Sequence, residues 1–235
     1  MRIALLEDDN ATGEILKTWL EADGHRVYRF LEGSKLIFTL QRDTFDLICL
    51  DWFLPDTTGD VILGWIREHL GWNIPVIFLT SRDAKSDIAN GLRIGADDYI
   101  PKPVSASELS ARVSALARRF GHTAGDQVLE RSPFMFDLRS RTVTRNGENV
   151  ALTQKEFELA AFIFQHAGTL LSRSHILEAV WGRSSSVTTR TVDIHMSRLR
   201  KKLGLTESAG WRLSAVYHHG YRLEEVRTPV AATAA

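Results

Sequence analysis

The sequence predicts an α/β domain with a doubly wound parallel sheet, followed by a second, smaller α+β domain. Over residues 1–120, short apolar runs alternate five times with amphipathic stretches of helical length, which is the rhythm of repeated βα units. Beyond residue 131 this rhythm gives way to short β-like runs and three helices. A chain of 235 residues is long for one domain and suits two.

Four apolar runs of the first domain are predicted to be buried parallel strands, namely IALL (3–6), LICL (47–50), VIFL (76–79) and DYI (98–100). The amphipathic stretches predict helices over 10–23, 33–42, 58–70, 84–94 and 105–120. Asn10 is expected to cap the first helix, and Gly24 to end it. By analogy with doubly wound proteins of the same rhythm, the strand order should be 2-1-3-4-5.

A linker is predicted over residues 121–131, where Gly and polar residues interrupt the periodicity. The domain after it, over 132–226, should begin with short strands at MFDL, TVTRN and NVALT, with Asn146-Gly147 as a hairpin turn. Thr153 followed by Glu156 predicts a capping box for a helix to about Gln165. Two more helices (172–181 and 189–203), a β-hairpin over 211–224 and a flexible tail over 227–235 complete the prediction.

The charges are divided unequally between the two halves of the chain. Residues 1–120 carry 14 Lys+Arg against 18 Asp+Glu and the remainder 15 against 11, although the whole chain is neutral. A basic second half is expected to bind a polyanion. The single Cys49 lies within LICL, so we interpret it as a small buried hydrophobe and not as a redox group. Without a signal-like start or an apolar run of roughly 18 residues, the protein is expected in the cytoplasm, away from membranes.

Polar side chains stand at the end of each predicted strand of the first domain: Glu7, Asp8, Asp51, Thr80 and Lys102. The carboxyl ends of parallel strands meet at one edge, where open α/β sheets bind their ligands. Three carboxylates there would repel one another unless a hard cation such as Mg²⁺ neutralised them. Asp51 is then placed to attack an activated phosphorus atom and become an acyl phosphate, with Lys102 and the Thr80 hydroxyl beside the phosphoryl oxygens.

Two other activities of such a fold are less favoured. Mg²⁺-dependent phosphohydrolases with an Asp nucleophile typically carry a general acid two residues later, and here that residue is Phe53. We therefore predict no enzyme activity beyond self-phosphorylation of Asp51 and slow loss of the phosphoryl group. Flavin binding would need a phosphate-cradling loop at Asp8 and Asp9, where the negative charges would repel it.

Four motifs, EDD, LDWFLPDTTG, FLTSRD and GADDYIPKP, make residues 1–120 resemble the receiver domain of bacterial two-component response regulators. The resemblance implies that a sensor histidine kinase phosphorylates Asp51 and that Lys102 contacts the phosphate. It implies a Mg²⁺ site made by Glu7, Asp8, Asp51 and the backbone carbonyl of Phe53, with Asp9 not a ligand. It also implies that Thr80 and Tyr99 form the switch pair and that the Lys102-Pro103 bond is cis.

The helix predicted over 189–203 has two distinct faces. Val192, Met196, Leu199 and Leu203 follow helical spacing and should form a buried stripe. The opposite face should hold Arg190, Ile194, Ser197, Arg198 and Lys201, flanked by His195, Arg200 and Lys202. An ordinary solvated basic face is the alternative, but a preceding helix and a following hairpin give the order of a winged helix-turn-helix, which favours DNA binding.

Further motifs, LTQKEFELA, LSRSHILEAVWG, RTVDIHMSRLRKKL and HGYRL, make residues 132–226 resemble the DNA-binding domain of the OmpR/PhoB class of response regulators. The resemblance implies DNA contacts from Arg190, Thr191, Asp193, Ile194, His195, Arg198, Arg200, Lys201, Tyr217 and His219. Among these, Ile194 should meet a thymine methyl and Asp193 a cytosine amino group. The family wing commonly reads TVRGxGYR and this chain reads AVYHHGYR, so His218 or His219 should contact DNA only when protonated.

In this class the phosphorylated receivers form a homodimer, which brings two DNA-binding domains to tandem half-sites. The resemblance assigns the interface to Ile88, Asp97, Asp98, Glu108 and Arg112, with Ile88 where an Arg would usually face Glu108. The favoured function is a transcription factor switched by Mg²⁺-dependent phosphorylation of Asp51, with RNA polymerase as a further partner. The alternative is a DNA-binding regulator whose receiver dimerises without phosphorylation.

Overall fold

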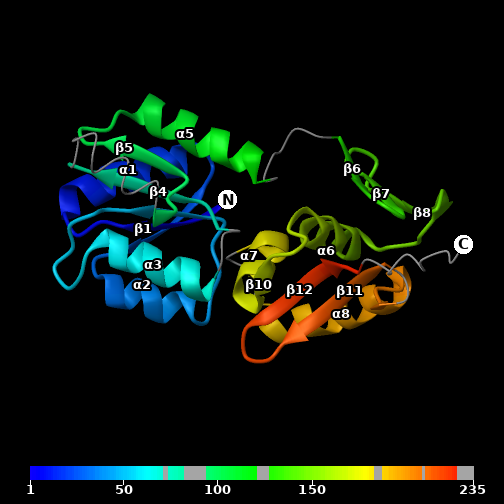
Figure 1. Cartoon of the computed structure of the whole chain (residues 1–235). Helices are drawn as coiled ribbons and strands as arrows, with labels where there is room; N and C mark the ends of the chain where they lie inside the picture. The colour runs from blue at the N-terminus through cyan, green and yellow to red at the C-terminus, as the bar shows by residue number, and fades with distance from the viewer. Residues whose placement is uncertain (71–73, 82–93, 121–126, 183–186, 208–209, 227–235) are drawn as a thin grey trace, which may run out of the picture. The chain divides into compact units, whose positions relative to one another are not determined.

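The computed structural model describes residues 1–70, 74–81, 94–120, 127–182, 187–207 and 210–226. The chain divides into two compact units, Met1–His122 and Thr123–Ala235. Figure 1 shows the first unit from blue to green and the second from green to red. Among the described residues, the first unit holds two apolar clusters and the second unit holds one.

Five parallel strands form the sheet of the first unit, in the expected order β2-β1-β3-β4-β5. Their bounds are β1 Arg2–Leu6, β2 Arg26–Phe30, β3 Leu47–Leu50, β4 Val76–Thr80 and β5 Asp98–Pro101. β1, β3 and β4 are buried along their whole length, because helices cover both faces of the sheet. β2 is an edge strand in which only Val27 is buried, which explains why no continuous apolar run marks this strand in the sequence.

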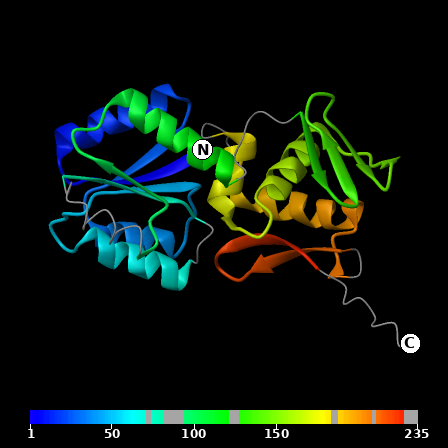
Figure 2. The same ribbon diagram turned by 45° about the horizontal axis from the view of Figure 1, so that its top comes forward.

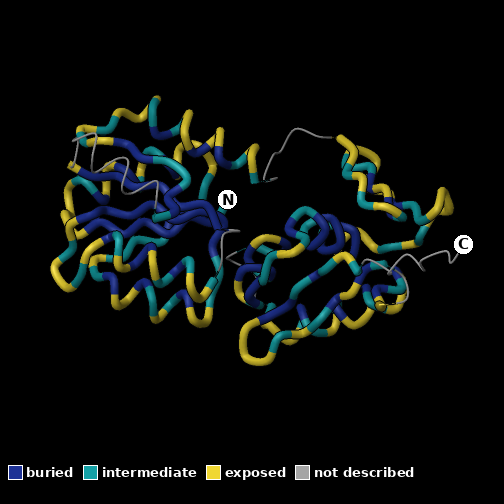
Figure 3. Tube along the Cα trace, in the orientation of Figure 1, coloured by how far each residue is buried: buried dark blue, intermediate teal, exposed yellow. Residues whose placement is uncertain are grey.

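The helices described in the first unit are α1 Asn10–Ala22, α2 Gly33–Leu40, α3 Gly59–His69 and α5 Ala106–Arg119. Figure 1 shows α1 and α5 on one face of the sheet and α2 and α3 on the other. The two faces carry separate apolar cores, with the outer sides of the helices exposed (Figure 3). The helix predicted over 84–94 falls almost wholly on 82–93, outside the described residues.

The start of α1 differs from the prediction. Asp9 is the cap, with its carboxylate accepting from the Thr12 N–H at 2.8 Å, and Asn10 is the first helical residue. Asp9 has the extended backbone of a capping residue, which leaves its side chain free to reach the third helical position. The Lys102-Pro103 bond is cis as expected, and Ser132-Pro133 is cis as well.

The second unit begins with a four-stranded antiparallel sheet in the order β6-β7-β8-β9. Its strands are β6 Val128–Arg131, β7 Phe134–Asp137, β8 Thr142–Arg145 and β9 Glu148–Asn149. β6 corrects the predicted linker, because 128–131 pairs with β7 although two of its four residues are exposed. Asn146 and Gly147 have φ angles of 51° and 84°, the left-handed conformation that a tight hairpin turn requires.

Three helices and a second small sheet complete this unit. They are α6 Gln154–Gln165, α7 Arg173–Trp181, α8 Thr189–Leu203, β10 Leu170–Ser172, β11 Trp211–Val216 and β12 Gly220–Glu225. The capping box of Thr153 and Glu156 is present, and α8 ends at Gly204 with φ 62°. Figure 2 shows the β11–β12 hairpin extending below α8, which is the predicted winged helix-turn-helix arrangement. No helix in the described part of the chain is long and apolar enough to cross a membrane.

Candidate functional site

Three carboxylates meet at the carboxyl edge of the parallel sheet, as predicted. Glu7 and Asp51 are buried, Asp8 is exposed, and one oxygen of each lies within 4.8 Å of the others. The strand ends fix this arrangement, because the Asp51 N–H donates to the carbonyl oxygen of Leu6 at 2.9 Å and so aligns β3 with β1. We refer to Glu7, Asp8 and Asp51 as the acidic cluster.

Lys102 follows β5 and reaches into the acidic cluster. Its Nζ donates to Glu7 Oε2 and to Asp51 Oδ2, both at 2.6 Å. Burial lowers the Lys102 pKa, but the hydrogen bonds and charges of Asp51 and Glu7 outweigh it and raise this pKa overall. Burial raises the pKa of Glu7 in spite of the neighbouring ammonium. The Lys102 ammonium therefore stays charged. Burial disfavours the anionic form of Glu7, so a bound cation would stabilise this carboxylate.

The donor set of the acidic cluster fits Mg²⁺. All three side chains offer carboxylate oxygens, the ligands that this hard cation prefers. One ammonium against three carboxylates leaves an excess of negative charge for a divalent cation to neutralise. The metal role of the Phe53 carbonyl stays a prediction; the Phe53 side chain itself is 56 % exposed.

The Asp51 carboxylate is held from both sides. Its Oδ1 accepts from the Trp52 N–H at 2.5 Å and the Phe53 N–H at 3.3 Å, while Oδ2 accepts from Lys102. Behind it, Gly59 at the start of α3 approaches so closely that a Cβ there would lie 2.5 Å from the Asp51 carbonyl oxygen. This backbone packing and the two N–H donors give the predicted acceptor a defined orientation.

The predicted switch pair lies on two neighbouring strands: Thr80 is the last residue of β4, and Tyr99 lies within β5. Thr80 is fully buried and Tyr99 is 6 % exposed. The ring centroid of Phe78 lies 4.9 Å from that of Trp52 and 6.1 Å from that of Tyr99. A row of aromatic rings thus leads from the residue after Asp51 to Tyr99, and the switch role itself stays a prediction.

Sequence reasoning missed Arg29 in β2. Its Nη2 donates to the carbonyl oxygens of Glu7 and Asp9, on either side of Asp8. Two features of the sequence could have pointed to Arg29. The rhythm requires a strand between the first two helices, where Arg29 lies, and Gly13 is a small residue early in α1 that faces Arg29.

The residues assigned to the receiver interface divide into two groups. Asp98 pairs with Arg112 at 3.2 Å, and Arg112 with Glu108 at 3.6 Å, on a part of β5 and α5 that remains open to solvent. Asp97 accepts from Arg67 Nη2 at 2.8 Å and from the Val76 N–H at 2.9 Å inside the unit, and its interface role stays a prediction. Ile88 lies outside the described residues.

The two faces of α8 agree with the prediction. Val192, Met196, Leu199 and Leu203 are fully buried. Arg190, Ile194, Ser197, Arg198 and Lys201 are exposed, and Ile194 is exposed by 52 % despite its apolar side chain. The exposed face is therefore a basic surface with one central apolar residue, a composition suited to the major groove of DNA.

Four flanking residues of α8 also make contacts within the protein. Lys202 is exposed beside the basic face as expected, and it also pairs with the buried Glu156 at 2.6 Å. Asp193 Oδ1 accepts from Arg173 Nε at 2.9 Å and from the Tyr221 hydroxyl at 2.6 Å, contacts the sequence did not predict. Arg200 Nε donates to the Leu213 carbonyl oxygen at 3.1 Å, and His195 Nδ1 lies 2.8 Å from the Thr191 carbonyl oxygen. Thr191 is half-buried at the start of the helix.

The tip of the β11–β12 hairpin carries three exposed residues, Tyr217, His218 and His219. Tyr217 is 84 % exposed, and its ring centroid lies 3.9 Å from that of His218. His218 has a φ of 58°, in the position where the family wing commonly has Gly. His219 Nδ1 lies 2.8 Å from the Tyr217 carbonyl oxygen.

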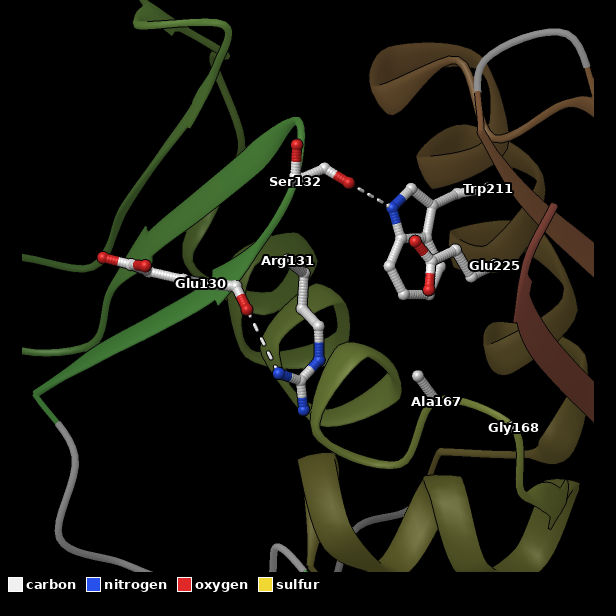
Figure 4. Close-up of a pocket in the computed structure, with 7 residues that line it drawn as sticks. All are labelled: Glu130, Arg131, Ser132, Ala167, Gly168, Trp211 and Glu225. Carbon is white, nitrogen blue, oxygen red and sulfur yellow. Dashed lines mark hydrogen bonds between the residues drawn. The ribbon is translucent and has the colours of Figure 1, made fainter. Parts of the chain in front are cut away.

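A pocket of about 490 Å³ lies elsewhere in the second unit (Figure 4). It is lined by Glu130, Arg131, Ser132, Ala167, Gly168, Trp211 and Glu225. The Trp211 indole N–H donates to the Ser132 carbonyl oxygen at 2.7 Å and so joins the end of β6 to β11. The pocket marks the seam between the two sheets, and none of the predicted site residues lines it.

The parallel sheet with an acidic cluster, followed by a winged helix with an exposed basic face, defines a two-domain regulator that binds DNA. Residues 3–114 match the family model of the response regulator receiver domain, and residues 147–223 match that of the transcriptional regulatory protein C-terminal domain.

Among curated relatives, the chain is 37 % identical over 224 residues to the phosphate regulon transcriptional regulatory protein PhoB of Rhizobium meliloti, covering 95 % of this chain and 98 % of that protein. It is 39 % identical over 204 residues to the transcriptional regulatory protein QseB of Escherichia coli O157:H7, covering 87 % and 92 %. It is 33 % identical over 225 residues to the sensory transduction protein RegX3 of Mycobacterium tuberculosis, covering 94 % and 98 %. The chain therefore belongs to the OmpR/PhoB class of response regulators, the DNA-binding transcriptional regulators of two-component systems.

Proposed function

We propose that Mg²⁺-dependent phosphorylation of Asp51 by a sensor histidine kinase switches this regulator in the cytoplasm. The observation that carries the proposal is the acidic cluster with Lys102 bonded to both Glu7 and Asp51. This arrangement supplies a nucleophilic carboxylate, an ammonium for the phosphoryl oxygens and oxygen ligands for a cation.

In the proposed reaction an oxygen of Asp51 forms a bond to phosphorus as the P–N bond of a phosphohistidine breaks, and the leaving imidazole keeps the electron pair. The Trp52 and Phe53 N–H groups keep Asp51 oriented through Oδ1. The Lys102 ammonium stabilises the negative charge that develops on the phosphoryl oxygens, and the Thr80 hydroxyl donates a hydrogen bond to one of them. Mg²⁺ bound by Glu7, Asp8, Asp51 and the Phe53 carbonyl would offset the charge of the incoming group.

The experiment is incubation of the full chain with Mg²⁺ and a small phosphodonor, followed by intact-mass measurement. The wild type should gain one phosphoryl group, whereas Asp51→Asn, and the wild type with a chelator, should gain none. DNA affinity is then compared between treated and untreated samples. If the wild type gains a phosphoryl group but both proteins bind DNA equally with and without the donor, the regulator works without phosphorylation.

The exposed face of α8 supports double-stranded DNA as the ligand of the second unit. Lys201→Ala should weaken binding to all duplex sequences alike and lower the slope of log affinity against log salt by about 1, because Lys201 faces solvent. Arg198→Ala should relax base preference at a cost of about 1–3 kcal/mol.

Lys202→Ala is the matched control for Lys201→Ala. Lys202 is the next basic residue but pairs with Glu156, so its loss should lower the stability of the unit and leave the salt slope near the wild-type value. Equal salt slopes for the wild type and Lys201→Ala would contradict the assigned outward face.

Asp98, Glu108 and Arg112 support a receiver homodimer, since their charges lie on one surface of β5 and α5 and can exchange partners with a second copy. RNA polymerase completes the proposed partners, as the target of a DNA-bound regulator.

A further inference from the structure

We infer that Arg29 is a positioning residue of the metal site, which holds the backbone of residues 7–9 so that Asp8 joins the acidic cluster. The inference rests on the proposed Mg²⁺-dependent function. Arg29 lies on the edge strand β2, and its side chain is only 12 % exposed.

The contacts of Arg29 bracket Asp8. Nη2 donates to the Asp9 carbonyl oxygen at 2.9 Å and to the Glu7 carbonyl oxygen at 3.3 Å, so one nitrogen joins the residues before and after Asp8. Nη1 pairs with Glu14 Oε1 on α1 at 3.3 Å. The guanidinium thus connects the loop of the acidic cluster to the first turns of α1.

Asp8 depends on this backbone more than the other two carboxylates do. Lys102 orients the side chains of Glu7 and Asp51 directly. Asp8 is exposed, and the bonds on either side of it hold its backbone. A cation ligand on a loop with three successive acidic residues must be held against their mutual repulsion, and Arg29 Nη2 does this by bonding two carbonyl oxygens.

Gly13 provides the space for the guanidinium. A Cβ at Gly13 would lie 2.2 Å from Arg29 Nε, 2.5 Å from Cζ and 2.8 Å from Nη2. Gly13 is buried inside α1, where glycine is less favourable for the helix than alanine. Gly13 N–H also donates to the Asp9 carbonyl oxygen, the same acceptor that Arg29 uses. A larger residue at position 13 must therefore shift the Arg29 guanidinium from its place against the loop.

The test is calorimetric titration of the full chain with MgCl₂. Arg29→Lys keeps the positive charge but loses the guanidinium that joins the two carbonyl oxygens to Glu14, and Gly13→Ala keeps Arg29 but removes its space. Each should raise the Mg²⁺ dissociation constant about 10-fold, because the loss of a positioning group around a metal site typically weakens metal binding by this amount. Because both changes break the same contact, the double variant should lose no more than either single variant.

Controls separate positioning from loss of fold. Arg26→Lys, on the same strand, should bind Mg²⁺ like the wild type. Phosphorylation of Asp51 in Arg29→Lys should return to the wild-type extent at saturating Mg²⁺, which a misfolded acceptor would not do. Wild-type Mg²⁺ affinity in both Arg29→Lys and Gly13→Ala, or additive losses in the double variant, would overturn the inference while Mg²⁺ binding by the wild type still supported the proposed function. Absence of Mg²⁺ binding by the wild type would overturn the proposed function, and the inference with it.

Discussion

His219 illustrates how one hydrogen bond decides what a residue can bind. Its Nδ1 lies 2.8 Å from the Tyr217 carbonyl oxygen, which can only accept, so Nδ1 carries the proton of the neutral ring. Nε2 is then an acceptor and repels a phosphate oxygen. A contact between Nε2 and the DNA backbone therefore requires a second proton on the ring.

Replacing each of two glycines of α3 by alanine should change the stability of the first unit in opposite directions. A Cβ at Gly59 would lie 2.5 Å from the Asp51 carbonyl oxygen and 2.7 Å from Phe78, whereas one at Gly64 meets nothing within 4 Å. Gly59→Ala should destabilise the first unit by about 1–3 kcal/mol through overpacking. Gly64→Ala should stabilise it by up to about 1 kcal/mol, because alanine favours a helix interior. Urea unfolding followed by circular dichroism measures both, and a destabilised Gly64→Ala would show that this helix position is not open.

At the scale of elements, Asp193 joins three of them. From α8 it accepts hydrogen bonds from Arg173 at the start of α7 and from Tyr221 on β12. Burial, followed by the hydrogen bond to Asp193, raises the pKa of Tyr221 to about 12, so its hydroxyl keeps its proton at any ordinary pH. Asp193 therefore aligns the basic helix with the hairpin, a role distinct from the base contact expected from sequence.

The variants Tyr221→Phe and Asp193→Asn distinguish these two roles. Loss of the hydroxyl should cost about 1.5–3 kcal/mol of stability, the usual range for a hydrogen bond to a charged group. Both variants should then weaken binding to all DNA sequences alike. Binding selection with a randomised duplex pool is the measurement. A change of preference at a single base pair in Asp193→Asn, with stability unchanged, would assign Asp193 to base reading instead.

The elements that sequence predicted best are those whose signal is local. Continuous apolar runs identified β1, β3 and β4, and helical spacing identified the buried stripe of α8. The edge strands β2 and β6 lack such runs because much of their surface faces solvent. The pairs Arg67–Asp97 and Glu156–Lys202 join residues 30 and 46 positions apart, so spacing along the chain gave no sign of them.

At the scale of the whole molecule, the chain separates two electrostatic tasks. The acidic half gathers carboxylates at a sheet edge, and the basic half exposes cationic residues on α8. Only the second half carries the charge that attracts DNA. Under the proposed function, a phosphoryl group on Asp51 therefore has to act on DNA binding indirectly, and the proposed pairing of two chains through the receiver provides such a route.

If phosphorylation acts by pairing two receivers, its effect on DNA affinity should depend on the number of half-sites in the duplex. Phosphorylated wild-type protein should bind a duplex with two tandem half-sites, chosen by in vitro selection, about 10²-fold tighter than the unphosphorylated protein, because the second contact becomes intramolecular. Binding to a single half-site should not change. Arg112→Glu should abolish the gain on tandem sites while leaving single-site affinity intact. It replaces the positive charge that pairs with Asp98 and Glu108 by a negative charge that repels both. Anisotropy with the two duplexes, alongside sedimentation velocity, measures affinity and pairing together. An equal gain on single and tandem half-sites would mean that the switch operates within one chain, by freeing its DNA-binding unit and not by joining two.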